Sequence, residues 1–365
     1  MSSIMNIKQS LKALILRRAT RKRVMRSSNK SPENILFLRY DRIGDMVLTT
    51  PVFREYKKVY PNSKIYVLAS KTNSEIIRFN PYIDQIFINH KHSFISDIPS
   101  LLKLRKLNID IAVEFDHSVV PHAIMRLRII KPKKIFSVRK SGRYGVPGKE
   151  LLLYDKYSEK LKNEHARDVW LRTIESLTGE VANKNYEIFL NKESIEKAEK
   201  FTKQLGDSLY VGFNLKGAVR GKKIHFADFE KLANQIKRNS HEVKIILFST
   251  PEEREKLKKR IDESKLTNVF ISYPTFSVID LCALIMRMNI VITPDTSVVH
   301  IASAFNIPII SIHEKNIDSY NLFRPQSTIS RTVFSEASDS LNGFKIGEVM
   351  KFFKEIMVIL GKKLL

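Results

Sequence analysis

The sequence predicts an α/β protein with two doubly wound domains, each built on a parallel sheet. Short apolar runs with strand character alternate with helical patterns through most of the chain, which is typical of βαβ units. This alternation lapses near the middle of the chain and then begins again. The chain has 365 residues, which is long enough for two domains of ordinary size. We therefore expect two such domains with a cleft between them.

The first domain is predicted over residues 31–185. Its first strand follows from the apolar run at residues 35–38, which lacks helical spacing. Residues 139–155 mix Gly with Arg and Lys and predict a long loop, and such loops are usually functional. Residues 178–185 are polar enough for a linker. The expected strands are 34–40, 65–69, 85–89, 109–115 and 134–138, and the expected helices are 46–59, 75–79, 101–107, 123–128 and 165–177.

The second domain is predicted over residues 186–340, and a last helix over residues 341–365. That helix is indicated by apolar side chains at Val349, Phe352, Phe353 and Ile356. The expected strands of the second domain are 210–214, 243–248, 269–272, 290–293 and 309–312, and its expected helices are 226–238, 252–261, 278–288 and 297–305.

Composition describes a globular protein with an unusual charge. Its formal net charge of +25 calls for an acidic partner, such as nucleic acid, anionic lipid or a phosphorylated substrate. The one cysteine, Cys282, excludes an internal disulfide framework. It lies in an apolar run, so we expect a buried and inert thiol. No apolar run reaches the ~20 residues of a membrane-spanning helix.

Residues 1–30 contain nine Lys and Arg residues and no Asp or Glu. Ile4, Ile7, Leu11 and Leu14 recur there at helical spacing. A basic amphipathic helix of this kind is typical of segments that lie on an anionic membrane surface. The apolar core is too short for a signal peptide. The alternative is a disordered basic tail.

A candidate for chemistry follows the first predicted strand. Gly44 predicts a tight turn there, and the next helix is expected to begin near Asp45. Ligands of open α/β sheets bind at the carboxyl ends of the strands, where this carboxylate is expected. Asp45 is therefore a candidate catalytic residue. The alternative is that it caps its helix, where a negative charge is also favourable.

A second candidate follows the strand at 290–293. Asp295, Thr296 and Ser297 lead into a helix, and His300 lies about one turn inside it. The free N–H groups of a helix start bind phosphate, and the hydroxyls add donors. Asp295 could accept hydrogen bonds from sugar hydroxyls. The alternative is a capped helix with a buried core histidine.

The loop at residues 214–225 is a third candidate. It combines glycines with Lys216, Arg220, Lys222 and Lys223, which suits a diphosphate, although a solvated basic loop is equally ordinary. Glu253, in the first turn of a predicted helix, could contact a ribose or simply favour its helix start.

Two of these segments resemble the signatures of glycosyltransferase family 9, which includes the ADP-heptose:lipopolysaccharide heptosyltransferases. The first signature, a basic residue followed by Gly-Asp and then Thr and Pro, is matched at Arg39, Gly44, Asp45, Thr49 and Pro51. The second signature begins with an aspartate and continues through a histidine, two alanines and a proline, and it is matched at Asp295, His300, Ala302, Ala304 and Pro308. The resemblance extends from about residue 33 over nearly the whole chain.

The resemblance implies a GT-B architecture, in which the C-terminal helix crosses back to the first domain. It implies an inverting, metal-independent transfer of a sugar from a nucleotide-diphosphate donor, ADP-heptose first among them, without a cofactor. Asp45 would be the general base. Donor-binding roles fall on Lys222, Lys223, Glu253, Asp295, Thr296, Ser297 and His300. Two departures lie on the donor side: Ser297 stands where the family has glycine, and Ile224 and His225 replace a Trp-Pro pair.

The acceptor is expected on the first domain. Arg39, Arg42, Arg126, Arg128 and Arg139 could contact an anionic, lipid-linked core saccharide, although a solvated basic face is equally possible. We expect a cytoplasmic enzyme that is peripheral on the inner membrane of a Gram-negative cell. Two alternatives are a non-catalytic homologue that binds a nucleotide sugar and a nucleic-acid-binding protein. The second is suggested by charge alone, since the sequence has no zinc-ligand spacing or RNP-type aromatics.

Overall fold

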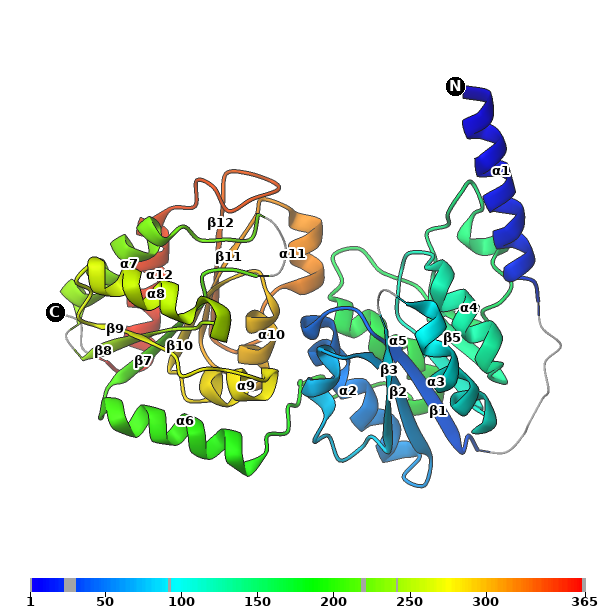
Figure 1. Ribbon diagram of the computed structural model, residues 1–365, viewed down its shortest axis with the longest axis horizontal. Coiled ribbons are helices and arrows are strands. Elements are labelled where there is room, and N and C mark those ends of the chain that lie inside the picture. The colour runs from blue at the N-terminus through cyan, green and yellow to red at the C-terminus, as the bar shows by residue number, and fades with distance from the viewer. Residues whose placement is uncertain (1, 23–30, 91–92, 218–220, 241, 363–365) are drawn as a thin grey trace. The chain divides into compact units, whose positions relative to one another are not determined.

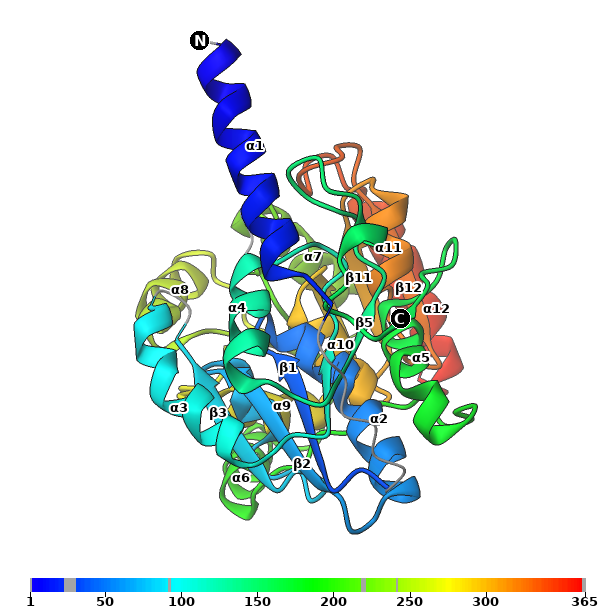
Figure 2. The same cartoon turned by 90° about the vertical axis from the view of Figure 1, so that its right-hand side faces the viewer.

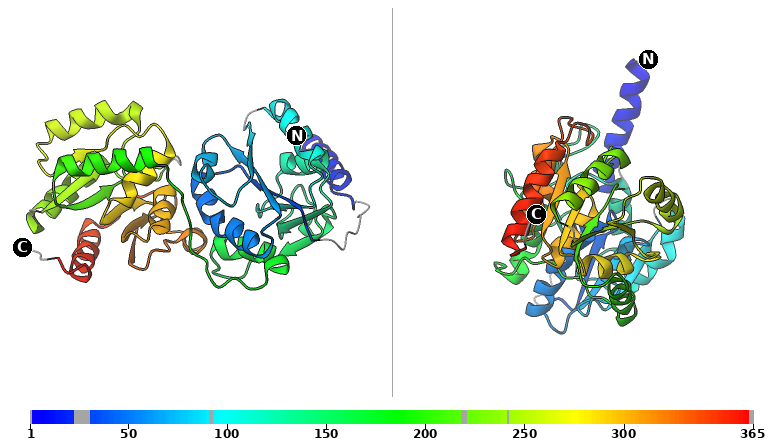
Figure 3. Two further views of the ribbon diagram at one scale, coloured as in Figure 1. Left: turned by 90° about the horizontal axis from the view of Figure 1, so that it is seen from below. Right: turned by 90° about the vertical axis from the view of Figure 1, so that its left-hand side faces the viewer.

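The chain forms two compact units, Met1–Asn185 and Tyr186–Leu365. The structure, a computed structural model, describes residues 2–22, 31–90, 93–217, 221–240 and 242–362 (Figure 1). The side chains of Ile4 and Ile7, and residues Arg23, Arg26, Lys30 and Arg220, lie outside this described part. The division falls between residues 185 and 186, where the sequence placed the domain boundary. Each unit holds a parallel six-stranded sheet with helices on both faces (Figure 3).

The first unit has the strand order β3-β2-β1-β4-β5-β6. The helices α2 and α5 contact each other on one face of this sheet, and α3 and α4 contact each other on the opposite face. Its elements are α1 (Ser2–Ala19), β1 (Asn34–Arg39), α2 (Ile43–Val59), β2 (Lys64–Ser70), η1 (Asn73–Ile77), β3 (Gln85–Asn89), α3 (Phe94–Lys106), β4 (Ile111–Glu114), α4 (Pro121–Ile130), β5 (Lys134–Val138), η2 (Gly148–Glu150), β6 (Lys156–Ser158) and α5 (Ala166–Thr178).

The second unit has the strand order β12-β11-β10-β7-β8-β9. All of its ladders are parallel, as in the first unit. Its elements are α6 (Lys192–Leu205), β7 (Leu209–Phe213), α7 (Phe226–Asn239), β8 (Val243–Leu247), α8 (Pro251–Glu263), β9 (Val269–Ile271), α9 (Val278–Met286), β10 (Ile290–Pro294), α10 (Ser297–Ala304), β11 (Ile309–His313), α11 (Ile317–Phe323), β12 (Ser330–Phe334) and α12 (Ile346–Ile359).

The predicted α/β fold class is confirmed, and the start of one helix differs from the prediction. Helix α3 begins at Phe94 instead of residue 101, and Ser93 caps it by accepting a hydrogen bond from Ser96 N. Pro99 obscured this start, because a proline after the first turn removes a helical hydrogen bond. Helix α1 extends over most of the N-terminal segment that the sequence marked as an amphipathic helix.

The C-terminal helix α12 packs on α7, β11 and β12 within its own unit. Val349, Phe353 and Ile356 are fully buried there and belong to the core of the second unit. The apolar face of this helix is thus part of the core of its own unit, and the expected crossing to the first domain stays a prediction. An amphipathic helix predicted from sequence shows which face is buried and leaves open which sheet buries it.

Two further features bear on later points. Cys282, in α9, is buried and forms no disulfide, as its apolar surroundings predicted. No helix in the described ranges combines the length and apolar character that a membrane span requires.

Candidate active site

In the first unit, the candidate site lies where β1 ends and α2 begins. We expected a turn at Gly44 and a helix start near Asp45, but α2 already begins at Ile43. Gly44 is buried inside its first turn, and the turn itself consists of Asp41 and Arg42. Arg42 occupies the N-cap position without a side-chain cap. Asp45 is thus the third residue of the helix and does not occupy the N-cap position, so the capping alternative does not describe its position.

Asp45 shares a buried cation with Asp41. The Arg39 guanidinium lies 3.0 Å from the Asp41 carboxylate and 3.7 Å from that of Asp45. The Arg39 side chain is only 2 % exposed, and its guanidinium stacks on the Trp170 ring of α5 at 3.6 Å from the ring centroid. Asp45 keeps a partly exposed carboxylate, and its carbonyl oxygen accepts hydrogen bonds from Arg39 Nε and Thr49 Oγ1. The aspartate is therefore held in place and still accessible.

Further acids surround this pair at the ends of β1 and β4. The Asp41 side chain is 33 % exposed, yet loss of hydration raises its pKa to about 7. Arg39 opposes this effect, and the Asp45 and Asp116 carboxylates add to it. Burial also raises the pKa of Glu114 to about 7, against the lowering effect of Lys140. Glu114 and Lys140 form a buried ion pair. The carboxyl edge of this sheet thus contains carboxyl groups that titrate near neutrality.

The five predicted acceptor contacts differ widely in their surroundings. Arg39 and Arg126 are both buried, and Arg126 is paired with Asp97 at 2.7 Å. Neither side chain therefore lies on an open surface, where a contact with an acceptor would be expected. Arg128 donates to the carbonyl oxygens of Ala19 and Arg21 and so holds the end of α1. The remaining two, Arg42 and Arg139, are at least partly exposed, and Arg139 pairs with Glu159.

In the second unit, the site forms around the start of α10. Thr296 is the N-cap, and its side chain accepts a hydrogen bond from Val298 N at 3.3 Å. Asn214 Nδ2, at the end of β7, donates to Thr296 Oγ1. Ser297 is half-buried at the first helical position, and His300 is buried one turn later. The structure thus brings Thr296, Ser297 and His300 onto one helical turn beside β7.

Lys222 joins this helix start to the next strand. Its ammonium forms ion pairs with Asp295 and with Glu314, the latter at 3.2 Å. His313 Nδ1 lies 3.9 Å from Asp295 Oδ2. Burial alone would raise the pKa of Asp295, but His313 and Lys222 outweigh it and lower the pKa. Burial lowers the pKa of His313, against the raising effect of the Asp295 and Glu314 carboxylates. One cation therefore faces two carboxylates here.

The loop between β7 and α7 runs close to α10. Gly217 is required there, because a Cβ at this position would lie 2.5 Å from Thr296 Cγ2. Gly217 N donates to Lys222 O, and Lys223 is exposed. Glu253, at the start of α8, pairs with Lys216. The described parts of this loop thus pair with each other and place Lys222 beside Asp295.

Glu314 and His313 were missed by sequence reasoning. Both lie at the end of β11, a predicted strand, and the carboxyl end of a strand beside a ligand site was the signal that could have found them. Trp170 was also missed, because nothing in a helix sequence indicates which cation its aromatic side chain contacts.

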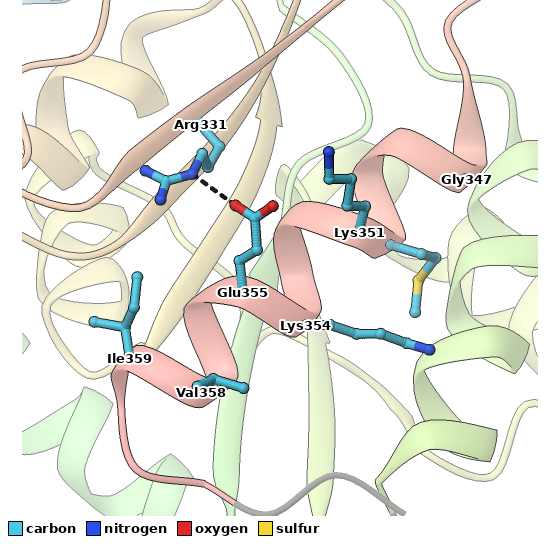
Figure 4. Close-up of a pocket in the computed structure, with 8 residues that line it drawn as sticks. Arg331, Gly347, Lys351, Lys354, Glu355, Val358 and Ile359 are labelled. Carbon is cyan, nitrogen blue, oxygen red and sulfur yellow. Dashed lines mark hydrogen bonds and ion pairs between the residues drawn. The ribbon is translucent and has the colours of Figure 1, made fainter.

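A surface pocket elsewhere contains none of the predicted site residues. It lies along α12 and is lined by Arg331, Met350, Lys351, Lys354, Glu355 and neighbouring apolar side chains (Figure 4). The Arg331–Glu355 ion pair, at 3.0 Å, crosses it. Within the described ranges, no three His, Cys, Asp or Glu side chains are grouped so as to hold a metal ion.

Comparison with known proteins gives consistent results. The profile of glycosyltransferase family 9 (heptosyltransferase) matches residues 103–339, well over half of the chain. This match includes Lys222 and the start of α10, and it begins after Asp45. Lipopolysaccharide heptosyltransferase 1 of Campylobacter coli is 22 % identical over 351 residues, which cover 88 % of this chain and 98 % of that protein.

Solved structures share the fold. A family 9 glycosyl transferase from Veillonella parvula superimposes with a TM-score of 0.75 at 18 % identity, covering 90 % of this chain and 97 % of that one. Escherichia coli ADP-heptose lps heptosyltransferase II gives a TM-score of 0.70 at 14 % identity, covering 90 % and 99 %.

Proposed function

This chain belongs to glycosyltransferase family 9, and on that premise we propose that it transfers a heptose from ADP-heptose to a saccharide of the lipopolysaccharide core. The Campylobacter coli relative, which aligns over nearly its whole length, supports the acceptor class. The name of the Escherichia coli enzyme with the same fold supports ADP-heptose as the donor. The observation that carries the proposal is a partly exposed Asp45 held by buried Arg39 in a chain of this family.

The proposed reaction is a single displacement. The acceptor hydroxyl oxygen attacks C1 of the heptose while the C1–O bond to the β-phosphate breaks, and ADP leaves with the electron pair. The hydroxyl proton passes to the Asp45 carboxylate, which acts as general base. Attack opposite the leaving group inverts the configuration at C1. The first unit carries the acceptor in this proposal, and the second unit carries the donor.

The leaving diphosphate needs positive charge. In this proposal Lys222 and the N–H groups at the start of α10 supply it, so that no metal ion is required. Lys222 must then turn from Asp295 and Glu314 toward the phosphates, which leaves Asp295 to accept hydrogen bonds from donor hydroxyls. Thr296, Ser297 and His300 lie at the same helix start. Lys223 belongs to the neighbouring loop, and Glu253 pairs with Lys216 of that loop.

The proposed location is the cytoplasmic face of the inner membrane, with the N-terminal basic segment on the lipid surface. The described part of α1 supports this, because Leu11, Leu14 and Ile15 are exposed beside Lys8, Lys12 and Arg18. The acceptor would then be an anionic, lipid-linked saccharide.

Asp45→Asn is the direct test of the mechanism. We expect transfer to fall by roughly 10²–10⁴-fold, the usual contribution of a general base, while ADP-heptose binding stays unchanged. Heptose transfer to a truncated core acceptor is measured by mass spectrometry and donor binding by calorimetry. Asp207→Asn, at an exposed position of the second unit, is the matched control.

Two outcomes would contradict the proposal. Near-normal transfer by Asp45→Asn would remove this residue as the base. A wild-type chain that binds ADP-heptose and transfers nothing to any core acceptor would indicate the non-catalytic homologue instead.

A further inference from the structure

The helix α1 packs on the first unit through one side only. Ala13, Leu16 and Thr20 are buried, and the Arg128 side chain donates to the carbonyl oxygen of Ala19 at the end of the helix. At 100° per residue, Leu11, Leu14 and Ile15 lie on the opposite side of this helix. Leu14 is 63 % exposed, and its two neighbours in this group are similarly open. We call these three residues the α1 stripe.

Helix α3 repeats this arrangement. Asp97, Leu101 and Leu104 are buried, and the helix also carries a separate row of exposed apolar side chains. Ile95, Ile98 and Leu102 form this row, the α3 stripe, at the i, i+3 and i+7 spacing of one helix face. Ile95 is 78 % exposed. Single exposed apolar side chains are ordinary, whereas a row of them on one helix face is typical of an interaction site.

The exposed charged side chains of α3 are all positive. Lys103, Arg105 and Lys106 occupy the last turn and are exposed. The only acidic residue of α3 is Asp97, which is fully buried against Arg126. The exposed charged side chains of α3 are thus all cations, as on the outward side of α1, where Lys8, Lys12 and Arg18 border the α1 stripe.

The two stripes belong to one layer of the first unit. Buried residues of α1 and α3 share the hydrophobic core on the same face of the sheet, and α4 contacts both helices (Figure 2). Met125, on the outer side of α4, is also exposed, so α4 adds an apolar residue to this layer.

We propose that the α3 stripe is a second lipid-contacting element, which docks together with the α1 stripe on an anionic bilayer. Membrane contact by α1 is part of the proposed function above, and this inference rests on it. The occupant is identified by charge: apolar side chains can enter the acyl boundary while the bordering Lys and Arg bind anionic headgroups. A lipid-linked acceptor is thereby presented to the unit that carries Asp45.

The test uses the full chain and sedimentation with vesicles of phosphatidylethanolamine and phosphatidylglycerol. The α3 variant replaces Ile95, Ile98 and Leu102 with Ser. The matched control replaces three exposed apolar residues elsewhere, Val59, Phe276 and Ile317, with Ser. We expect the α3 variant to bind vesicles at least tenfold more weakly than wild type, since full transfer of one large apolar side chain from water contributes roughly 10- to 150-fold. The control should bind as wild type does.

Two further variants keep the test independent of folding. Ile95→Trp should bind vesicles more tightly than wild type, because Trp favours the membrane interface. Replacing Lys103, Arg105 and Lys106 with Gln should weaken binding at low salt and reduce its salt dependence. Phosphatidylcholine vesicles, which lack net charge, should bind all forms weakly.

Several outcomes would overturn the inference. Equal vesicle binding by the α3 variant and the control would mean that α3 does not contact lipid. A variant that loses self-association in analytical ultracentrifugation while keeping vesicle binding would show the stripe to be a contact between copies.

Transfer to a soluble, delipidated acceptor is measured on each form as well. The α3 variant should transfer heptose to this acceptor as wild type does. A wild-type chain without this transfer activity would count against the proposed function and would leave the lipid-contact inference untouched. Deleting residues 1–22 separates the contribution of α1, because unchanged vesicle binding would refute that part of the proposed function.

Discussion

Two carboxylates at the end of β1 compete for one guanidinium, that of Arg39. Asp41 is the nearer of the two at 3.0 Å, and Asp45 lies at 3.7 Å. When Asp41 is protonated, the positive charge of Arg39 faces the Asp45 carboxylate alone. When Asp41 ionises, it takes up part of that charge and leaves the Asp45 carboxylate freer to receive the acceptor proton. Asp41 is thus a positioning residue that tunes its neighbour in the proposed reaction.

This sharing predicts a pH dependence. Because the pKa of Asp41 lies at about 7, wild-type transfer should increase as the pH rises through 7. Asp41→Asn should remove this step and leave a flatter profile. The measurement is the rate of heptose transfer at saturating donor between pH 5.5 and 8.5, a range chosen to span about 1.5 units on either side of that pKa. The same step in Asp41→Asn would assign the titration to another group.

Single residues were the hardest to interpret from sequence. Asp295, Thr296 and His300 were predicted to lie together, and the start of α10 brings them together, because sequence neighbours on one helical turn are close by geometry. Arg126 was read as a ligand contact, yet its partner Asp97 is 29 residues away along the chain. A cation in a sequence does not reveal whether a distant acid already neutralises it.

At the scale of elements, α3 is anchored by a buried polar centre. Asp97 accepts hydrogen bonds from Arg126, from Asn89 Nδ2 and from His90 N. These contacts join α3 to α4 and to the end of β3. The stripe on the outer side of α3 is therefore supported by a side chain whose charge is fully enclosed.

Removing one partner of this ion pair should be costly. We expect Arg126→Met to lower the free energy of unfolding by about 3–5 kcal/mol, because it leaves the Asp97 charge buried without its cation. The double variant Asp97→Asn/Arg126→Met should lose less than Arg126→Met alone. Urea unfolding followed by circular dichroism measures both, with exposed Arg105→Met as the control. An Arg126→Met chain of normal stability but weak acceptor binding would instead restore the sequence interpretation.

Element type was largely predictable, and the omissions have physical causes. The strands β1, β4, β7 and β10 are buried on both faces and have continuous apolar runs, so each was predicted close to its observed place. The edge strands β6 and β12 were missed, since a three-residue strand and a half-polar edge carry little apolar signal. Helix α6 was missed because few of its residues are buried.

At the scale of the whole molecule, the work of the protein divides between two units with separate cores. The residues assigned to the donor all lie in Tyr186–Leu365, and the proposed base lies in Met1–Asn185. Each sheet presents its own strand ends, so each half-site is complete within one unit. The sequence showed this division because the alternation of strands and helices stops and restarts at the boundary.

This division predicts unequal stabilisation by nucleotide. ADP should raise the unfolding temperature of the second unit and leave that of the first unchanged, with about 2.7 kcal/mol gained at a hundredfold excess over Kd. Differential scanning calorimetry measures the two transitions. Lys222→Met should abolish the shift, whereas Asp45→Asn should keep it. A shift that survives Lys222→Met would place the nucleotide on other groups.

Because the thiol of Cys282 is buried, we expect it not to react with maleimides and other bulky thiol reagents. Any cysteine introduced at the surface would therefore be the sole reactive site on a 365-residue chain. Spectroscopic labels can be attached one at a time along α1 and α3 without first removing a native residue. The depth of each label relative to a bilayer could then be mapped position by position.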